Sequence, residues 1–357
     1  MASASSNDSA AAVSIGDRLV GDGRRVLIVA EAGVNHDGEV EKALRLVDVA
    51  AQAGADVVKF QVFRASTLVT ATAGTAVYQQ ASGARSQHEM LARLELSDDG
   101  FRRIREHCSA RQIEFLATPF SPPDVERLGM LDVRAIKIAS TDSTNTPLLR
   151  RAVKTGLPLI VSTGASTAEE IASSVERLRS WGVAGRLILL HCISGYPAPL
   201  EAANLRAIAS LRRLSGVPCG FSDHTRSTRI AGWAVAAGAC VLEKHFTLDR
   251  EAPGPDHWMS LTPVELAEYV SAAREVEEAL GSGEIGMAPI EADVRAVARK
   301  SVVAVMDIVA GQVVTPEMLC IKRPGGGIGP DQMGAVVGRR AATDIVADTV
   351  LTWELVR

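Results

Sequence analysis

Residues Val26–Phe63 read VLIVAEAGVNHDGEVEKALRLVDVAAQAGADVVKFQVF. Two short runs of apolar and β-branched residues, Val26–Gly33 and Val57–Phe63, predict two buried strands. The stretch between them, Glu39–Ala55, has apolar residues near one helical face, and Gly54 is placed to end a helix. A buried strand, an amphipathic helix and a second buried strand are typical of a parallel sheet covered by helices.

The same alternation continues along the chain. Further strand candidates are Glu114–Phe120, Ala135–Ser140, Leu157–Gly164, Leu187–Ser194, Cys219–Thr225 and Val241–Leu248. A second clear helix, Ser166–Gly182, has Ser166 or Thr167 as its N-cap and glutamates in its first turn. Eight such units favour an α/β fold of the closed (β/α)₈ barrel type, a TIM barrel, over an open sheet. The segment Val62–Leu96 is longer than an ordinary connection and is expected to form a loop over the barrel mouth.

The two ends of the chain depart from this pattern. Residues 1–17 are small and polar, lack the features of a secretory signal, and are predicted to be a disordered tail. The barrel is assigned to residues 18–280, and residues 281–297, which begin GSGEIGMAP, to a linker. Residues 298–357 contain short strand candidates and glycine turns. They predict a small β-rich domain that docks onto a partner surface.

The composition is that of a soluble globular protein, with 47% hydrophobic and 22% charged residues. A formal net charge of -4 and the lack of a long basic run argue against nucleic acid as the main ligand. Five cysteines without a C-x-x-C pair suggest neither a zinc ribbon nor a disulfide framework, and they fit a reducing cytoplasm. The longest nearly apolar run, Ile230–Leu242, is too short to cross a bilayer, so no membrane span is expected.

Polar residues lie at the end of every strand candidate, where the loops of a barrel form the working face. They include Glu31, Lys59, Gln61, Thr118, Lys137, Ser140, Ser162, His191, Ser222, Asp223, Glu243 and Lys244. A purely structural barrel has no need for so many ionisable groups at one rim. The pattern therefore indicates a catalytic or binding site.

Two histidines and two lysines at this rim have more than one interpretation. His224 and His245 end neighbouring strands, and with a carboxylate such as Asp256 they can hold a divalent metal with positions open for substrate. The alternative is that each imidazole hydrogen-bonds a loop carbonyl. Lys59 and Lys137 can bind a phosphate, form a Schiff base if desolvated, or pair with a carboxylate.

Hydroxyl groups near the lysines favour the anion-binding interpretation. Ser140, Ser162 and Ser222 can each donate to a phosphate or carboxylate. Glu31 ends an apolar strand, so its pKa is expected to be raised and it can act as an acid or a base, which is compatible with pairing to a lysine. Near the C-terminus, Arg323–Gly327 (RPGGG) presents an arginine that can recognise a carboxylate or phosphate.

A series of motifs in order resembles the N-acetylneuraminate (sialic acid) synthase family, which includes legionaminic and pseudaminic acid synthases and spore-coat polysaccharide synthases. The motifs are IVAEAGVNHDG, AGADVVKFQ, FLATPF, IKIAS, STGAS, HCISGYPAP, GFSDHT, EKHFTL and GPDH. The C-terminal part with KRPGGGI resembles the antifreeze-like (SAF) domain that ends those enzymes. The resemblance runs from about Val26 to the C-terminus.

The resemblance implies a condensation of phosphoenolpyruvate with the open-chain aldehyde of an N-acylated amino sugar, which gives a nine-carbon 2-keto acid and phosphate. It implies Mn²⁺ or Mg²⁺ on His224 and His245, Glu31 as the catalytic glutamate, and phosphoenolpyruvate-binding groups at Lys59, Thr118, Lys137, Ser140, Ser162 and Ser222. It also implies sugar-binding or metal-side positions at Gln61, Tyr196 and Asp256. Arg323 would reach the sugar's N-acyl group from the other subunit of a domain-swapped homodimer.

Two motifs depart from the family pattern on the sugar side. Bacterial members often carry KIGSGE and HCTNIYP where this chain has KIASTD and HCISGYP, so Asp142 replaces a longer carboxylate and Ser194 an amide. The acceptor is therefore left open between N-acetylmannosamine, a diacetamido-trideoxy hexose and a spore-coat-type substrate. Two further hypotheses are a Schiff-base aldolase that uses Lys59 or Lys137, and an inactive barrel that serves as a scaffold in surface-polysaccharide assembly.

Overall fold

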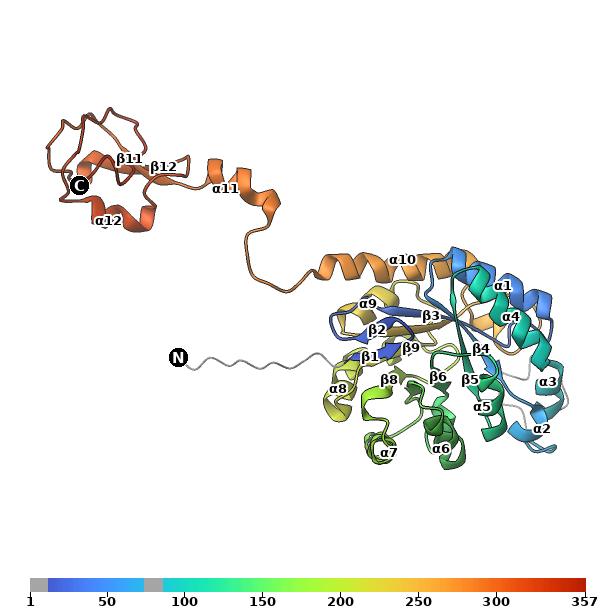
Figure 1. Ribbon diagram of the computed structural model, residues 1–357. Helices are drawn as coiled ribbons and strands as arrows, with labels where there is room; N and C mark the ends of the chain where they lie inside the picture. Colours follow the sequence, from blue (N-terminus) through green and yellow to red (C-terminus); the bar gives the residue numbers. More distant parts are fainter. Residues whose placement is uncertain (1–11, 74–85) are drawn as a thin grey trace. The chain divides into compact units, whose positions relative to one another are not determined.

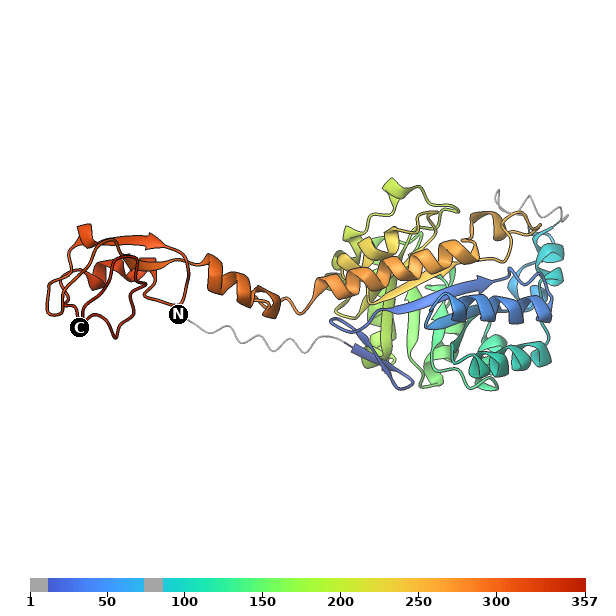
Figure 2. The same ribbon diagram turned by 90° about the horizontal axis from the view of Figure 1, so that it is seen from above.

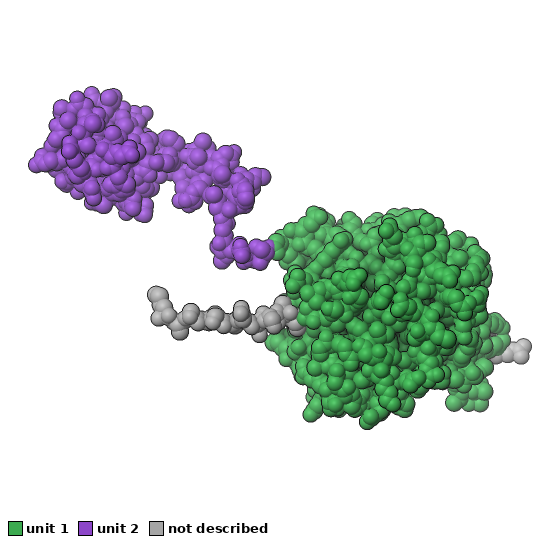
Figure 3. All heavy atoms as spheres, viewed as in Figure 1, with its two compact units in different colours: residues 1–281 green, residues 282–357 purple. Residues whose placement is uncertain are grey.

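The computed structural model describes residues 12–73 and 86–357. The chain divides into two compact units, Met1–Gly281 and Ser282–Arg357, which Figure 3 shows in different colours. All five cysteines are free thiols. Within the described ranges, no helix is both long and apolar enough to cross a membrane.

Eight parallel strands form the centre of the first unit (Figure 1). They are β3 (Leu27–Gly33), β4 (Val57–Val62), β5 (Glu114–Pro119), β6 (Ile136–Ile138), β7 (Leu159–Ser162), β8 (Leu187–Cys192), β9 (Cys219–Asp223) and β10 (Val241–His245). Each lies inside a range predicted from the sequence. The ladder order is β5-β4-β3-β10-β9-β8-β7-β6, and β5 and β6 are in contact where this order ends. The strands therefore form the predicted barrel, which is nearly closed.

Helices cover the outside of the barrel, as Figures 1 and 2 show, with α10 lying along one side. The longer ones are α1 (Val40–Gln52), α4 (Asp98–Ala110), α5 (Pro122–Gly129), α6 (Thr146–Lys154), α7 (Ala168–Ser180), α8 (Arg206–Ser215), α9 (Ile230–Ala236) and α10 (Pro263–Leu280). The N-cap of α7 is Thr167, which forms a capping box with Glu170. Two short helices, α2 (Ala65–Leu68) and α3 (Gln87–Arg93), lie in the long connection after β4.

Two apolar layers hold the barrel together because successive side chains of a strand point to opposite faces. Outward-facing residues such as Ile28 and Phe60 pack against the helices. Inward-facing residues such as Leu27, Val29 and Val57 form a second cluster inside the barrel, near the N-terminal ends of the strands. This inner cluster fills only one end of the barrel, and the other end is free for polar side chains.

A hairpin of β1 (Ala12–Ile15) and β2 (Arg18–Gly21) precedes the barrel. Its side chains Val13, Ile15 and Val20 are buried in the inner cluster, so the hairpin closes the N-terminal end of the barrel. The prediction of a disordered tail over residues 1–17 is therefore wrong for residues 12–17. The alternating apolar residues there are too few to stand out in the sequence, and they are buried only because the barrel supplies a partner surface. Residues 1–11 of the predicted tail lie outside the described residues.

The second unit, Ser282–Arg357, has its own small core, which includes Val302, Ile308, Ile345 and Leu351. Its elements are α11 (Ala292–Ala298), β11 (Ser301–Ala304), β12 (Leu319–Lys322) and α12 (Met333–Val336), with β11 and β12 antiparallel. The backbone amide of Gly325 donates to the carbonyl of Ala296. Most of α11 falls inside the predicted linker 281–297, and this bond attaches it to the glycine-rich loop of the unit.

Candidate functional site

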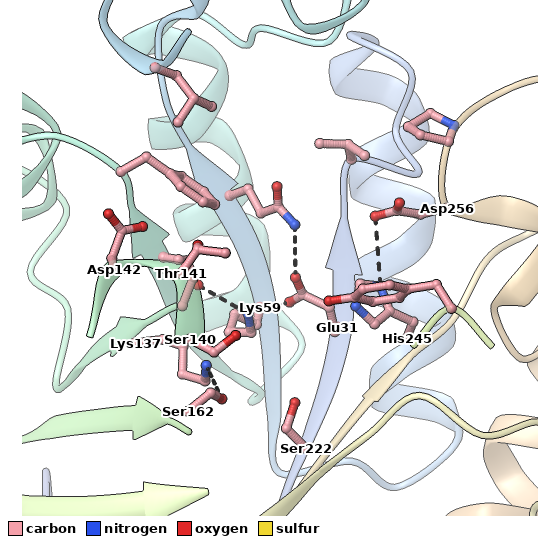
Figure 4. Close-up of a pocket in the computed structure, with 18 of the residues that line it drawn as sticks. Glu31, Lys59, Lys137, Ser140, Thr141, Asp142, Ser162, Ser222, His245 and Asp256 are labelled. Atoms are coloured by element: carbon pink, nitrogen blue, oxygen red, sulfur yellow. Dashed lines mark hydrogen bonds and ion pairs between the residues drawn. The ribbon is translucent and has the colours of Figure 1, made fainter. Parts of the chain in front are cut away.

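Inward-facing polar side chains meet at the C-terminal end of the barrel. In β3, Leu27 and Val29 belong to the inner apolar cluster, and Glu31 follows them on the same face. The equivalent residues on the other strands are Lys59, Gln61, Thr118, Lys137, Ser162, Cys192, Ser222, Glu243 and His245. All of them line one cavity of about 420 Å³. Figure 4 shows Lys59, Lys137 and Ser162 together, with Asp142 and Asp256 on opposite sides of them.

Two lysines and two glutamates form a charged network on the floor of this pocket. Lys59 Nζ lies 3.0 Å from Glu31 Oε2 and 3.6 Å from Glu243 Oε2, and it donates to the Thr118 hydroxyl at 3.0 Å. Lys137 Nζ donates to Ser162 Oγ at 2.7 Å and lies 3.7 Å from Glu243 Oε1. The strand register explains the first contact, because Glu31 of β3 is directly opposite Lys59 of β4.

Burial and neighbouring charges shift the pKa values of these groups in opposite directions. Burial raises the pKa of Glu31 to about 7, although Lys59 opposes the shift. Burial alone would lower the pKa of Lys59, but Glu243 and Glu31 outweigh it and the pKa is raised. Burial lowers the pKa of Lys137. The pKa of Glu243 is lowered because Lys137 and Lys59 outweigh the effect of its burial. Of these four groups, Glu31 is the one whose pKa lies near neutral pH, and the shift has the direction that the sequence predicted.

The two predicted metal-binding histidines lie side by side, with ring centroids 5.5 Å apart. His224 Nδ1 is 2.8 Å from the carbonyl oxygen of Ile193. A carbonyl accepts only, so Nδ1 carries the proton and Nε2 keeps its lone pair. His245 Nδ1 is buried without a hydrogen-bond partner and lies 3.9 Å from Asp256 Oδ2. Burial lowers the pKa of both imidazoles, which keeps them neutral at pH 7.

This donor set fits a divalent metal ion with open coordination positions. Two neutral imidazoles line the pocket, and Nδ1 of His245 is buried without a hydrogen-bond partner. Over residues 12–73 and 86–357, no group of three or more His, Cys, Asp or Glu side chains is assembled as a complete ligand set. His224 and His245 therefore fit as two of the ligands of a metal ion. The described residues do not supply the further ligands that a closed, structural metal site would need.

The predicted sugar-side residues lie around the mouth of the pocket. Gln61 Nε2 is 3.4 Å from Glu31 Oε1, and the Tyr196 ring packs 4.3 Å from the His224 ring. Asp142 accepts a hydrogen bond from Asn145, and burial raises the pKa of its carboxyl. Burial also raises the pKa of Asp256, to about 6. Gly33 lies where three of these side chains converge: a Cβ there would be 3.3 to 3.5 Å from Glu31, Gln61 and Asp256.

Two predicted site residues do not line this pocket. Ser194 is exposed and is not a lining residue, but its Oγ is 3.5 Å from Oγ of the lining residue Ser140. Arg323 belongs to the second unit, Ser282–Arg357. All other predicted site residues, including His224, Asp142 and Asp256, are among the lining residues.

The long connection after β4 supplies an apolar wall, which consists of Leu68, Val69, Met90, Leu91 and Leu94. These residues pack with Val34, Phe63 and Phe120 in a cluster of their own. Val62–Leu96 was expected to form a loop over the barrel mouth: its described part does line the pocket, but it contains the helices α2 and α3. Residues 74–85 of this segment lie outside the described residues.

Strand alternation sorts the polar residues at the rim into those that face the pocket and those that do not. His191, Asp223 and Lys244 point outward: His191 bonds the carbonyl of Ala203, and Lys244 forms a buried ion pair with Asp223 at 2.8 Å. Glu243 was not among the predicted site residues, yet it contacts both lysines. Its spacing of two from His245 in β10 places both on the same face, and this signal was available in the sequence.

The family model described as the NeuB family matches residues 46–285, and that of the SAF domain matches residues 299–357. These two matches correspond to most of the barrel and to most of the second unit.

Similar proteins extend over nearly the whole chain. The N,N'-diacetyllegionaminic acid synthase of Legionella pneumophila is 40% identical, over 94% of this chain and 95% of its own length. The human N-acetylneuraminate-9-phosphate synthase is 34% identical, over 95% of both chains. A crystal structure of N-acetylneuraminic acid synthetase from Leptospira borgpetersenii, in complex with citrate, matches with a TM-score of 0.71 and 34% identity. The match covers 80% of this chain and 95% of that one.

Proposed function

The chain belongs to the NeuB family, and from this premise we propose that it joins phosphoenolpyruvate to the open-chain aldehyde of an N-acylated amino sugar. The acceptor is N-acetylmannosamine or a diacetamido-trideoxy hexose, and the products are a nine-carbon 2-keto sugar acid and phosphate. The named relatives are acid synthases, so the chain is an enzyme of the N-acetylneuraminate synthase type and not an inactive scaffold. The observation that carries the proposal is the pocket floor, where two lysines lie beside a carboxyl of near-neutral pKa.

Phosphoenolpyruvate carries a carboxylate and a phosphate, and the floor offers cations and hydroxyl donors for both. Both lysines have short contacts to hydroxyls and longer ones to Glu243, at 3.6 and 3.7 Å, and Lys59 also lies 3.0 Å from Glu31. Phosphoenolpyruvate can compete for the lysines because their Glu243 contacts are longer than a normal hydrogen bond. The proposed phosphoenolpyruvate-binding groups are Lys59, Thr118, Lys137, Ser140, Ser162 and Ser222.

The reaction needs proton transfers in both directions, and Glu31 is suited to them. When C3 of phosphoenolpyruvate bonds to the aldehyde carbon, the aldehyde oxygen gains a proton; when water adds to C2, the water loses one. The C2–O bond to phosphate then breaks and the 2-keto group forms. A carboxyl whose pKa is about 7 can hold a proton for either transfer. Lys59, 3.0 Å from Glu31, balances its charge when the proton has left.

His224 and His245 would hold a Mn²⁺ or Mg²⁺ ion at the edge of the same pocket. Such an ion supplies Lewis-acid stabilisation of the negative charge that develops on the aldehyde oxygen. Gln61, Asp142, Tyr196 and Asp256 would orient the sugar's hydroxyl and amide groups, and Ser194, next to Ser140, would assist them. Arg323 would contribute from the partner subunit of a domain-swapped homodimer.

The proposal is tested by phosphate release from phosphoenolpyruvate, with each acceptor and with Mn²⁺ or EDTA. Release should require both a sugar and the metal, and His245→Ala should reduce it at least about 100-fold. The Schiff-base alternative makes the opposite prediction: activity with pyruvate that EDTA does not affect, and borohydride trapping on Lys59 or Lys137. The proposal fails if the folded protein releases no phosphate with any acceptor.

A further inference from the structure

The connection after β10, residues 246–262, carries Asp256 to the pocket. Its two ends lie side by side, because the amide of Thr247 donates to the carbonyl of Leu261. Asp256 lies between these ends, directly before a short 3₁₀ turn (His257–Met259), and it lines the pocket (Figure 4). The backbone bond at the ends is several residues away from Asp256, so other contacts must fix the position of this residue.

His257, the residue after Asp256, is buried and is held from two directions. Its Nε2 lies 2.9 Å from Asp37 Oδ1, and its Nδ1 lies 2.6 Å from Thr247 Oγ1. Asp37 also accepts a hydrogen bond from Lys42 at 2.6 Å. Burial acts to raise the pKa of Asp37, but the hydrogen bonds from His257 and Lys42 outweigh it and the pKa is lowered. The ionised carboxylate can only accept, so Nε2 of His257 donates to it.

Asn35, in the same loop as Asp37, adds a second attachment. Its Nδ2 donates to the carbonyl of Phe246 at 2.8 Å and to Ser260 Oγ at 3.0 Å. Ser260 Oγ in turn donates to the carbonyl of Asp256 at 2.6 Å. The loop after β3 therefore holds the connection near both of its ends and next to Asp256.

Asp37 and His257 belong to the motifs VNHDG and GPDH, which meet although the two residues are 220 positions apart in the sequence. The chain passes closely over the pair: a Cβ at Gly254 would lie 2.6 Å from the His257 ring and 3.2 Å from Asp37 Oδ1. Neither Asp37 nor His257 lines the pocket, and both ring nitrogens of His257 are already bonded. The pair therefore does not contact the reacting groups, and its link to the pocket is the adjacent residue, Asp256.

We infer that Asp37 and His257 are positioning residues, which hold the carboxyl of Asp256 at the acceptor side of the pocket. This carboxyl is 3.9 Å from His245 Nδ1, too far for a hydrogen bond, so its place depends on the backbone that His257 fixes. The inference rests on the proposed function, in which Asp256 orients the sugar. Without the pair, Asp256 should leave this place, while the phosphoenolpyruvate groups on the strands should stay where they are.

The first test measures steady-state kinetics of the full chain with phosphoenolpyruvate, Mn²⁺ and either N-acetylmannosamine or 2,4-diacetamido-2,4,6-trideoxymannose, whichever the wild type uses better. His257→Leu should raise the acceptor KM about 10- to 100-fold and leave the phosphoenolpyruvate KM unchanged. His257→Gln, whose amide can still donate to Asp37, should recover most of the loss. A rise in both KM values, or no rise at all, overturns the inference.

A matched control and a double-mutant cycle separate positioning from general stability. His107 Nε2 lies 2.7 Å from Asp48 Oδ1, between α4 and α1, and neither residue lines the pocket. His107→Leu should therefore have wild-type KM values. Adding His257→Leu to Asp256→Ala should change kcat/KM less than about twofold, because His257 acts through Asp256. A full, additive loss in the double variant shows an independent role and overturns the inference.

Amide hydrogen exchange, followed by mass spectrometry, tests the pair without turnover. In His257→Leu, peptides from residues 246–261 should exchange at least about 10-fold faster than in wild type, and His107→Leu should not change them. Unchanged exchange in His257→Leu overturns the inference. Thr247→Val, compared with Thr247→Ser, replaces this variant if it does not fold. If the wild type releases no phosphate with either sugar, the proposed function fails, and the exchange result still decides whether the pair holds the connection.

Discussion

Glu243 lies between Lys59 and Lys137 and contacts both amines through different oxygens. The pocket floor therefore holds two cations and two carboxyls that are nearly inaccessible to water. Glu31 and Glu243 differ because the charges around them differ: Glu243 faces both lysines, and its pKa is lowered, while burial dominates at Glu31 and raises its pKa to about 7. The two glutamates thus differ in pKa because their surroundings differ.

The raised pKa of Glu31 predicts a pH-dependent change in stability. Its folded-state pKa of about 7 is above the ordinary value of 4.5, so folding favours the neutral form. The stability that Glu31 contributes is fully present below pH 4.5 and is lost as the pH rises through 7. Glu31→Gln, which is always neutral, should gain stability relative to wild type between pH 5 and pH 8, by up to roughly 3 kcal/mol.

Thermal or urea unfolding of both proteins at several pH values measures this difference. A difference in unfolding free energy that is flat across this range would mean that Glu31 is already ionised at pH 5 in the folded protein. The activity of Glu31→Gln should fall about 100-fold or more at every pH, because the proton carrier is lost.

The ion pair of Lys244 (β10) and Asp223 (β9) lies on the side of the strands that faces away from the pocket. We therefore expect it to have a purely structural role. Both side chains are essentially inaccessible, and Lys244 also donates to the carbonyl of Thr225. Lys244→Met should leave Asp223 charged and unpaired, at a cost of about 3–5 kcal/mol of unfolding free energy. Lys322 pairs with Asp348 at the surface, and Lys322→Met is the matched control, which should change stability little. Equal urea midpoints for the two variants would contradict this assignment.

At the scale of elements, the βα-connections differ in what they contribute. The strands carry the floor of the pocket, and the connection with α2 and α3 carries its apolar wall. The position of α3 depends on the loop after β3. Gly38 in that loop has φ +79°, and a Cβ there would clash with the carbonyl oxygen of Arg93 at the end of α3. The loop and the helix can approach this closely only because residue 38 has no side chain.

Gly38→Ala should therefore displace α3 and weaken acceptor binding. Gly156 is the matched control, since it has φ +77° but nothing within 4 Å of the place that a Cβ would occupy. Both variants should lose about 1–2 kcal/mol of stability from the left-handed backbone conformation, and Gly38→Ala should lose more through the clash. Steady-state kinetics should show a raised acceptor KM for Gly38→Ala alone, with the phosphoenolpyruvate KM nearly unchanged. Identical kinetics for the two variants would show that the position of α3 does not affect acceptor binding.

At the scale of the whole molecule, the barrel unit contains the complete set of proposed phosphoenolpyruvate and metal groups, and the second unit contains Arg323. Each unit has its own core. The second unit is therefore not needed to hold the pocket floor together. Under the proposed domain-swapped homodimer, its contribution is a single cation delivered to the partner's sugar site.

Complementation between two inactive variants tests this arrangement. Glu31→Ala and Arg323→Ala chains, unfolded and refolded together, form mixed dimers in which one site has Glu31 in its barrel and Arg323 from the other chain. About a quarter of the wild-type sites should then be restored in a random mixture. Each variant refolded alone should stay inactive. If the mixture stays inactive as well, Arg323 acts within its own chain or not at the site.

The sequence by itself determined the barrel and the position of all eight strands, because apolar periodicity and strand ends are local features, and together with the family resemblance it identified half of the residues that line the pocket. The tertiary structure decided the rest. The closed barrel places Glu243 between Lys59 and Lys137, and it buries Val13 and Ile15 of the predicted tail. The pKa shifts of Glu31 and Glu243 arise from burial and from charges on β3, β4, β6 and β10, and only the folded barrel brings these strands together.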